Sequence, residues 1–258
     1  MAEILTLAST QPPGERPRMP RTFRQLLANT LVTGVTSTFL WFALTFWVYL
    51  ETRSVVATGI VGGAFSISSA VLGPYFGTFV DRHRKHTAFV VTTAASAVCF
   101  AVAAAIYATV RGDQLLRLTS PWFWLLVAAT LLGSVAGQMR GIALSTCVTL
   151  LVPEDHRDRA NGMVGTVMGV AFAITSVFSG IGVGTAGMGW CYLAALVVTG
   201  GALLHILTIR IDEPDPAPPA DGERRRAVDV RAAVEAIRAT PGLAMLIALG
   251  AFNNLLAG

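Results

Sequence analysis

The stretch SVVATGIVGGAFSISSAVLGPYFGTFV, at residues 54–80, contains no Asp, Glu, Lys, Arg or His. A hydrocarbon layer about 30 Å thick is crossed by roughly 20 apolar residues in a helix. Because lipid offers no hydrogen-bond partners, only helices and closed barrels satisfy their backbone groups there, and this run is too long for a barrel strand. The stretch therefore predicts a transmembrane helix.

Comparable runs recur along the 258 residues, of which 53% are hydrophobic and only 13% are charged. A soluble domain carries about twice that charged fraction. We expect six full spans and a seventh that begins at Leu243 and is cut off at Gly258, which favours a fragment; the full spans are residues 25–49, 54–80, 87–110, 120–145, 161–183 and 187–209. The predicted fold class is an all-α membrane protein, a six-helix bundle followed by a truncated seventh helix.

The basic residues predict the orientation of these spans. Of the 19 Lys and Arg residues, only Arg53, Arg111 and Arg117 lie on one side of the expected helices. The others precede the first span or lie at the opposite ends of the helices, so the positive-inside rule predicts a cytoplasmic amino terminus in the cell membrane. Because they are spread over four segments and do not share one face, the net charge of +4 does not indicate a nucleic-acid partner.

Composition also suggests how the chain is divided. Residues 1–22, rich in Pro and Arg, are expected to form a disordered cytoplasmic tail without a cleaved signal peptide. The transmembrane bundle would occupy residues 23–210, with the lipid bilayer as its main partner. Residues 211–240 are expected to be a cytoplasmic linker with a short amphipathic surface helix, and residues 241–258 to begin the seventh helix.

A glycine, an acid and a basic cluster end the second expected span, in Gly77-Thr78-Phe79-Val80-Asp81-Arg82-His83-Arg84-Lys85-His86. The glycine permits close helix approach, the acid is an acceptor at the helix end, and the basic residues can satisfy carbonyls or face anionic head groups. The run resembles the Gly-x-x-x-Asp-Arg-x-x-Arg/Lys signature of the major facilitator superfamily. That resemblance implies a latch, in the outward-open state, between the halves of a twelve-helix carrier, formed by Gly77, Asp81, Arg82 and Lys85. The alternative is a basic loop that only sets topology.

A second motif follows the fourth expected span, in Leu151-Val152-Pro153-Glu154-Asp155-His156-Arg157-Asp158-Arg159-Ala160-Asn161-Gly162. We expect Pro153 to end that span, and Asn161 with Gly162 to open the next. The run resembles a motif of the drug and siderophore efflux branch, which includes enterobactin-exporter-like proteins; the matching residues are Pro153, Glu154, Arg159, Ala160, Asn161 and Gly162. The resemblance implies an efflux carrier of the cell inner membrane, an antiporter associated with multidrug resistance or siderophore export.

Small residues follow one face of the second and of the fifth expected helix. Small side chains let backbones approach closely and slide, and these two helices would be equivalent in an inverted repeat. We expect both faces to meet a missing carboxy-terminal half and to move during alternating access, with ordinary packing inside the bundle as the alternative. The glycines proposed for this role are Gly59, Gly63, Gly73, Gly169 and Gly180.

By the same resemblance, the first and fourth spans line a central cavity, with Thr38, Phe42, Phe46 and Arg140 as candidate lining residues. Aromatic and hydroxyl groups suit a bulky, largely apolar substrate, although the aromatic residues could instead face lipid. Trp47 is expected at the outer membrane interface. Arg140 either contacts a substrate or a proton relay in the cavity, or extends toward the cytoplasm from an overlong helix.

No Asp or Glu lies within the six expected spans. A proton-coupled cycle needs a titratable group with alternating access, so the acid would be Glu51, be supplied by the missing half, or not exist. His205 is a weaker candidate for this role.

These observations predict a secondary carrier that exports a hydrophobic or amphiphilic small molecule. The alternatives are an importer or uniporter of the same fold, and a fragment that transports nothing without its second half. An enzyme is not expected, because the sequence has no His-Glu-x-x-His motif and no paired acids or Ser-His pair within a span. No cofactor or metal is expected either, since Cys99, Cys147 and Cys191 form neither a disulfide framework nor a ligand set.

Overall fold

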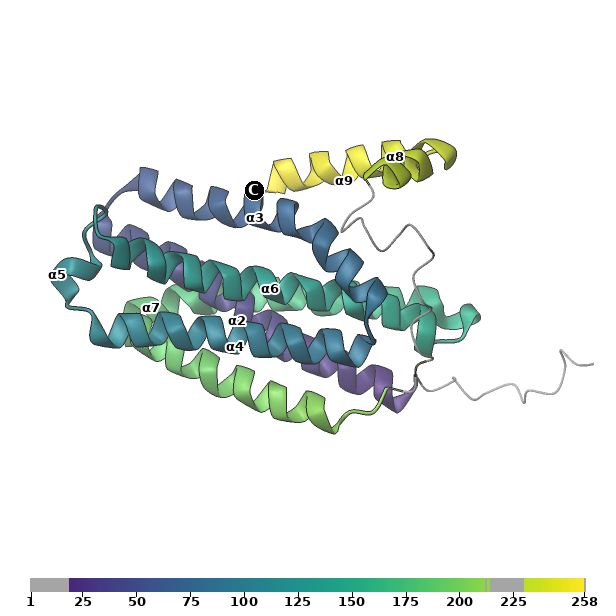
Figure 1. Cartoon of the computed structure of the whole chain (residues 1–258), viewed down its shortest axis with the longest axis horizontal. Coiled ribbons are helices and arrows are strands. Elements are labelled where there is room, and N and C mark those ends of the chain that lie inside the picture. The colour runs from purple at the N-terminus through teal and green to yellow at the C-terminus, as the bar shows by residue number, and fades with distance from the viewer. Residues whose placement is uncertain (1–18, 212, 214–229, 258) are drawn as a thin grey trace, which may run out of the picture.

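The computed structural model describes residues 19–211, 213 and 230–257, and the regular secondary structure of these residues is helical, without strands (Figure 1). The long helices are α2 (Arg21–Thr52), α3 (Val55–Arg82), α4 (Lys85–Thr109), α6 (Pro121–Leu151) and α7 (Arg157–Thr208). The shorter elements are α5 (Gly112–Leu115), the 3-10 helix η2 (Glu154–His156), α8 (Val230–Ala239) and α9 (Leu243–Ala257). The predicted all-α fold class is confirmed.

The helix α7 supplies the two spans expected at residues 161–183 and 187–209. Its 52 residues are broken at Gly187, whose φ of 80° and ψ of 165° lie outside the helical region. Glycine adopts such a φ readily because it has no Cβ atom. A Cβ on Gly182 would lie 3.6 Å from the Cys191 sulfur, so the two arms of α7 fold back on each other. Within the described residues, α7 and four other helices are long and apolar enough to cross a membrane.

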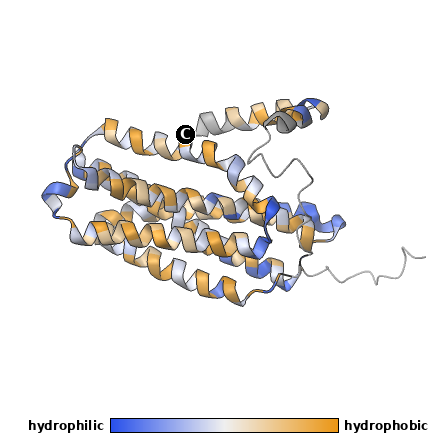
Figure 2. Cartoon of the chain, viewed as in Figure 1, coloured by the Kyte–Doolittle hydropathy of each residue, from blue (hydrophilic) through white to orange (hydrophobic). Residues whose placement is uncertain are grey.

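The long helices form one bundle in which α2 packs most extensively on α7, and α4 on α6. Polar residues gather at the two ends of the bundle, and apolar residues cover the middle of the helices (Figure 2). This banding suits a bilayer, because the acyl chains solvate the apolar middle and the head groups solvate the ends.

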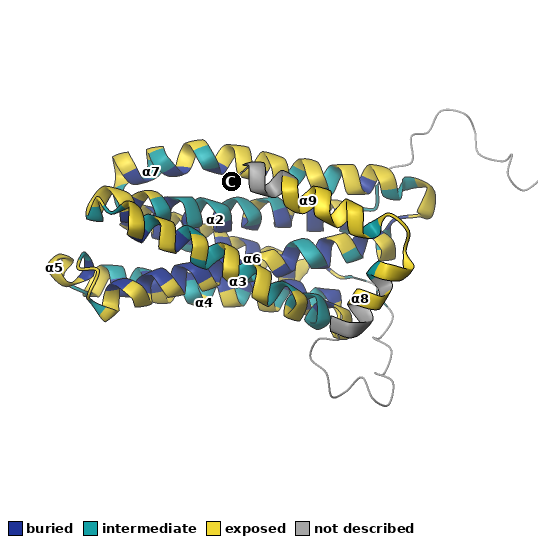
Figure 3. Cartoon of the chain, turned by 90° about the horizontal axis from the view of Figure 1, so that it is seen from above, coloured by how far each residue is buried: buried dark blue, intermediate teal, exposed yellow. Residues whose placement is uncertain are grey.

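The helix α3 lies at the edge of the bundle (Figure 1), and nearly all of its residues are exposed or half-buried (Figure 3). Its only buried residues are Ala57, Val61 and Val80, whereas Val55 and Ile67 are among its exposed apolar side chains. One side of α3 therefore presents apolar surface outside this bundle.

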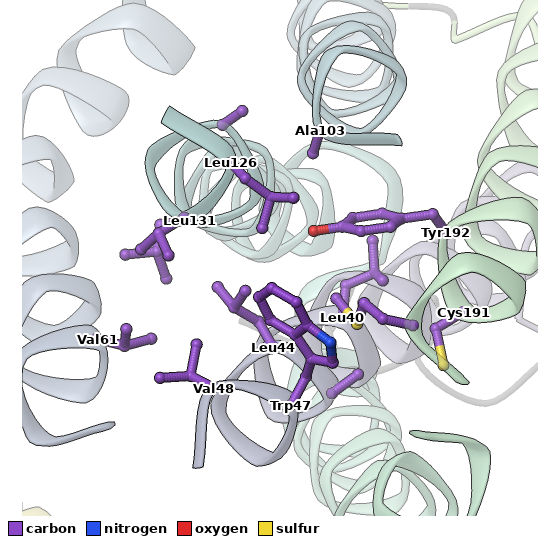
Figure 4. Packing of buried hydrophobic residues seen from close by; sticks show 14 of the residues in the cluster. Leu40, Leu44, Trp47, Val48, Val61, Ala103, Leu126, Leu131, Cys191 and Tyr192 are labelled. Carbon is purple, nitrogen blue, oxygen red and sulfur yellow. The ribbon is translucent and has the colours of Figure 1, made fainter. Parts of the chain in front are cut away.

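The larger hydrophobic cluster joins α2, α6 and the second arm of α7 (Figure 4). The Tyr192 hydroxyl, at the centre of this cluster, lies 2.6 Å from the Thr130 hydroxyl, so its polar end is satisfied. Trp47 is 3% exposed and packs against Tyr107 and Phe123, with ring centroids 5.9 and 6.4 Å apart. The interfacial position predicted for Trp47 is wrong, because aromatic rings from α4 and α6 enclose its indole.

The helices α4 and α6 approach each other closely at Gly133. The Ser96 hydroxyl donates a hydrogen bond of 2.7 Å to the Gly133 carbonyl. A Cβ on Gly133 would lie 2.5 Å from the Phe100 ring and 3.0 Å from the Cys99 Cβ. The contact therefore requires a residue without a side chain.

The segments outside the bundle are described only in part. The helix α2 begins at Arg21, so the last two residues of the expected disordered tail are helical. Residues 1–18 of that tail, and residues 212 and 214–229 of the expected linker, lie outside the described residues. The helix α8 falls within the predicted amphipathic segment, and its location on the membrane surface stays a prediction.

Candidate functional site

A cavity of about 190 Å³ lies between α2, α3, α6 and the first arm of α7. Sites for drug-sized ligands usually measure about 300–1,000 Å³, so this cavity can hold only part of such a molecule. Of the four candidate lining residues, Thr38 and Arg140 line it, whereas Phe42 and Phe46 do not. The full lining is Thr30, Gly34, Ser37, Thr38, Trp41, Phe65, Ser134, Gly137, Gln138, Arg140, Gly141, Met168 and Phe172.

Glycines on α6 shape the wall of this cavity. A Cβ on Gly137 would lie 2.8 Å from the Ser37 hydroxyl oxygen, and one on Gly141 would lie 3.2 Å from the Met168 methyl group. These two positions therefore let α6 approach α2 and α7 closely. The sequence did not single them out, because glycines that contact a neighbouring helix look the same as glycines that face lipid.

Arg140 is buried inside the bundle and is only 2% exposed. Its two terminal nitrogens donate to Asn29 Oδ1 at 3.0 and 2.8 Å, and to Thr93 Oγ1 at 3.1 and 2.7 Å. The guanidinium carbon lies 5.2 Å from the centre of the Phe89 ring. Arg140 lies about 16 Å along the axis from the end of α6 at Leu151, which is farther than an arginine side chain reaches. The alternative that Arg140 extends to the cytoplasmic surface is therefore wrong.

Asn29 connects Arg140 to the second arm of α7. Its amide nitrogen donates to the Ala202 carbonyl at 2.9 Å and lies 2.9 Å from His205 Nδ1. These contacts leave the amide oxygen facing Arg140, so α2, α4, α6 and α7 meet in one polar network. The sequence did not indicate that Asn29 is a partner of Arg140, because one polar residue in an apolar helix forms no repeating pattern.

Several polar atoms of the residues around this cavity have no hydrogen-bond partner among the described residues. They are the Thr30 hydroxyl, the Trp41 indole nitrogen, the Ser134 hydroxyl and Arg140 Nε. Buried polar groups without partners are uncommon, since each costs about 1–3 kcal/mol. Their concentration in cavity-lining residues marks this region as a candidate binding site.

The aromatic candidates lie beside the cavity wall. The Phe42 ring packs edge-on against Phe172, a lining residue, with centroids 5.4 Å apart. Phe46 is exposed and stacks on Phe42, with centroids 6.4 Å apart, and a Cβ on Gly180 would lie 3.6 Å from its ring. Trp41 and Phe65, stacked with centroids 4.6 Å apart, supply the aromatic lining instead.

The glycine stripes are mostly open to their surroundings in this bundle. A Cβ on Gly59, Gly63, Gly73, Gly77 or Gly169 would meet no atom within 4 Å. Only Gly180, among the proposed stripe residues, has a neighbour, the Phe46 ring. Contact of these faces with a second half stays a prediction.

The first loop motif joins α3 to α4. Lys85 is buried, and its ammonium group donates to the Val80 carbonyl at 2.6 Å and reaches the His83 carbonyl at 3.4 Å. Lys85 thus caps the carboxyl end of α3, while Asp81 and Arg82 are exposed. The latch function assigned by resemblance stays a prediction.

Glu213 caps the amino terminus of α4 from the segment after α7. Its two carboxylate oxygens accept the backbone N–H groups of Lys85 at 2.8 Å and His86 at 3.2 Å. A carboxylate at a helix amino terminus is favoured by the unpaired N–H groups and the helix dipole. No pattern in the sequence indicates this contact, because Glu213 lies 128 residues after Lys85.

The second loop motif joins α6 to α7. As expected, α6 ends just before Pro153, at Leu151. The next helix begins at Arg157, four residues before Asn161, so the prediction that Asn161 and Gly162 open it is wrong. The short helix η2 already turns the chain, and Arg157 extends back to the Thr149 carbonyl at 3.1 Å. Ala160 is buried, whereas Glu154, Arg159, Asn161 and Gly162 are exposed.

The long apolar helices and their polar ends define a multi-pass helical membrane protein, and the cavity lies between these helices. The family model described as Major Facilitator Superfamily matches residues 26–257, and the chain belongs to that superfamily of transmembrane transporters. A comparison with curated proteins gave no match.

Proposed function

We propose that this chain forms one translocating bundle of a secondary carrier that exports a hydrophobic or amphiphilic small molecule. Membership of the superfamily establishes transport in general terms, and the resemblance of residues 151–162 to the efflux branch supports the direction. The observation that carries the proposal is the cavity, whose lining combines aromatic rings with polar groups. Such a lining suits a molecule that is apolar over most of its surface and polar at one end.

The substrate site is completed by a second bundle across the exposed sides of α3 and the first arm of α7. Both helices contribute to the cavity, through Phe65 and through Phe172. Both also carry apolar side chains outside this bundle, including Val71, Val177 and Phe178. Alternating access then consists of one bundle rocking against the other across these smooth faces.

The carrier is oriented with its amino terminus and the loops after α3 and α6 in the cytoplasm, because the basic residues concentrate there. In that orientation the latch residues act on the cytoplasmic side and hold the outward-open state.

The experiment compares transport by the complete carrier with and without a bulky residue on the proposed rocking face. Gly63→Leu should abolish transport while leaving membrane insertion intact, and Gly201→Leu, at another position with open surroundings, should retain it. Gly180→Leu is less informative, since it also crowds Phe46 within this bundle. Unaltered transport by the Gly63 variant would refute the rocking face. Higher substrate levels in cells that express the carrier would identify an importer.

A further inference from the structure

We infer that Arg140 forms an anion site, which balances its charge with an anionic group on the substrate or with a free inorganic anion. The inference rests on the proposed function and adds the chemical class of the ligand. Its starting point is a charge imbalance. Among the described residues, no carboxylate bonds to Arg140, and the six spans contain no Asp or Glu.

The partners of Arg140 orient its guanidinium group but do not neutralise it. Both acceptors, the Asn29 amide oxygen and the Thr93 hydroxyl, are uncharged. A buried cation is costly unless a counter-charge accompanies it, and arginine keeps its proton in proteins. The site therefore gains much more from an anion than from a neutral ligand of the same shape.

The remaining polar groups around the cavity also favour a ligand rich in acceptors. Arg140 Nε and the Trp41 indole nitrogen can only donate hydrogen bonds, and both are without partners among the described residues. The hydroxyls of Thr30 and Ser134, also unpartnered there, can donate as well. A carboxylate, sulfonate or phosphonate offers several acceptor atoms and one or more negative charges, and none of the described residues that line the cavity is an acid that would repel it.

The size of a second cavity distinguishes an anionic substrate from a free inorganic anion. It measures about 10 Å³ and shares Ser37, Gly137 and Arg140 with the larger cavity. That volume is close to the minimum for one water molecule. An organic anion must therefore use the larger cavity, whereas a free ion of about the size of water can use the smaller one.

The test measures binding of radiolabelled naphthalene-2-carboxylate and of its neutral analogue, naphthalene-2-carboxamide, to the full chain in phosphatidylcholine nanodiscs. A zwitterionic buffer without chloride is used at neutral pH. We expect the carboxylate to bind about tenfold more tightly than the carboxamide, since hydrogen bonds between charged groups are markedly stronger than neutral ones. Arg140→Gln should reduce this preference to about one, and Arg140→Lys should keep part of it. The control Arg111→Gln removes an equal charge from an exposed loop and should leave the preference unchanged.

A second variant keeps the inference testable if Arg140→Gln does not fold. Asn29→Asp places a carboxylate at the position of the amide oxygen, 2.8–3.0 Å from the Arg140 nitrogens, and should remove the anion preference by supplying the counter-charge internally. Equal binding of both probes to the original chain would overturn the inference, as would a preference that survives in both Arg140→Gln and Asn29→Asp. If fluoride, which is about the size of water, binds in an Arg140-dependent way and the carboxylate does not, the ligand is the free ion. Binding is measured without transport, so a negative result here leaves the proposed carrier function intact.

Discussion

A methyl group added at Gly133, where two helices are in close contact, should destabilise the bundle. The same group added to a glycine on an open helix face should not. In Gly133→Ala the new carbon would lie 2.5 Å from the Phe100 ring and 3.0 Å from the Cys99 Cβ. Phe100 is fully buried and the Cys99 Cβ is fixed to the backbone, so neither can move without disturbing the contact between α4 and α6. Overpacking of this kind costs about 1–3 kcal/mol, and about 2 kcal/mol corresponds to roughly a thirtyfold change in the unfolding equilibrium.

The matched control is Gly63→Ala, where the new methyl group meets no atom within 4 Å. Both variants gain the same helix propensity, up to about 1 kcal/mol, so that effect cancels when the two are compared. Unfolding in mixed detergent and SDS micelles, followed by the fluorescence of the five tryptophans, measures the difference. Equal stability of the two variants would refute the close packing of α4 on α6 at Gly133.

Two further variants test contacts between distant parts of the chain. Asn29→Asp puts a charged acceptor beside Arg140 but also removes the amide donor to the Ala202 carbonyl. In the same micelles the substitution should therefore be more favourable, by about 1–2 kcal/mol in the free energy of unfolding, in the chain with Arg140 than in Arg140→Gln. Equal effects in the two backgrounds would contradict the account of an unbalanced cation. Glu213→Gln should weaken the cap on α4 by about 1 kcal/mol. The substitution removes the negative charge of the carboxylate that accepts hydrogen bonds from the backbone N–H groups of Lys85 and His86. Hydrogen exchange at these two amides should then accelerate about fivefold, and an unchanged rate would show that Glu213 does not cap the helix in solution.

The helices of this fold could be predicted because, inside a bilayer, the backbone N–H and C=O groups must bond to one another. Long uncharged runs must be helical in lipid, and the break between the fifth and sixth spans falls at Gly187, within a glycine-rich segment of the sequence. The start of α7 was misjudged, because Asn161 resembles a helix cap although η2 and Arg157 already begin the helix.

The candidate site was predictable only in part, because its geometry depends on contacts between distant residues. Arg140 stood out as a cation in an apolar helix, but its partner Asn29 lies 111 residues away on another helix. Trp47 was assigned to the membrane interface because composition does not reveal which face of α2 meets α4 and α6. Hydropathy identifies residues that avoid water, and packing decides whether they face lipid or protein.

The most direct test of a membrane-spanning bundle with its basic loops on one side is the accessibility of single cysteines. In a chain whose three native cysteines are replaced, cysteines are introduced one at a time at Arg82, Gln114 and Asp155, exposed positions at the end of α3, in α5 and in η2. A membrane-impermeant maleimide should label the Gln114 variant in intact cells, and the Arg82 and Asp155 variants only in inside-out vesicles. Labelling of the Arg82 and Gln114 variants from the same side of the membrane would contradict the proposed topology.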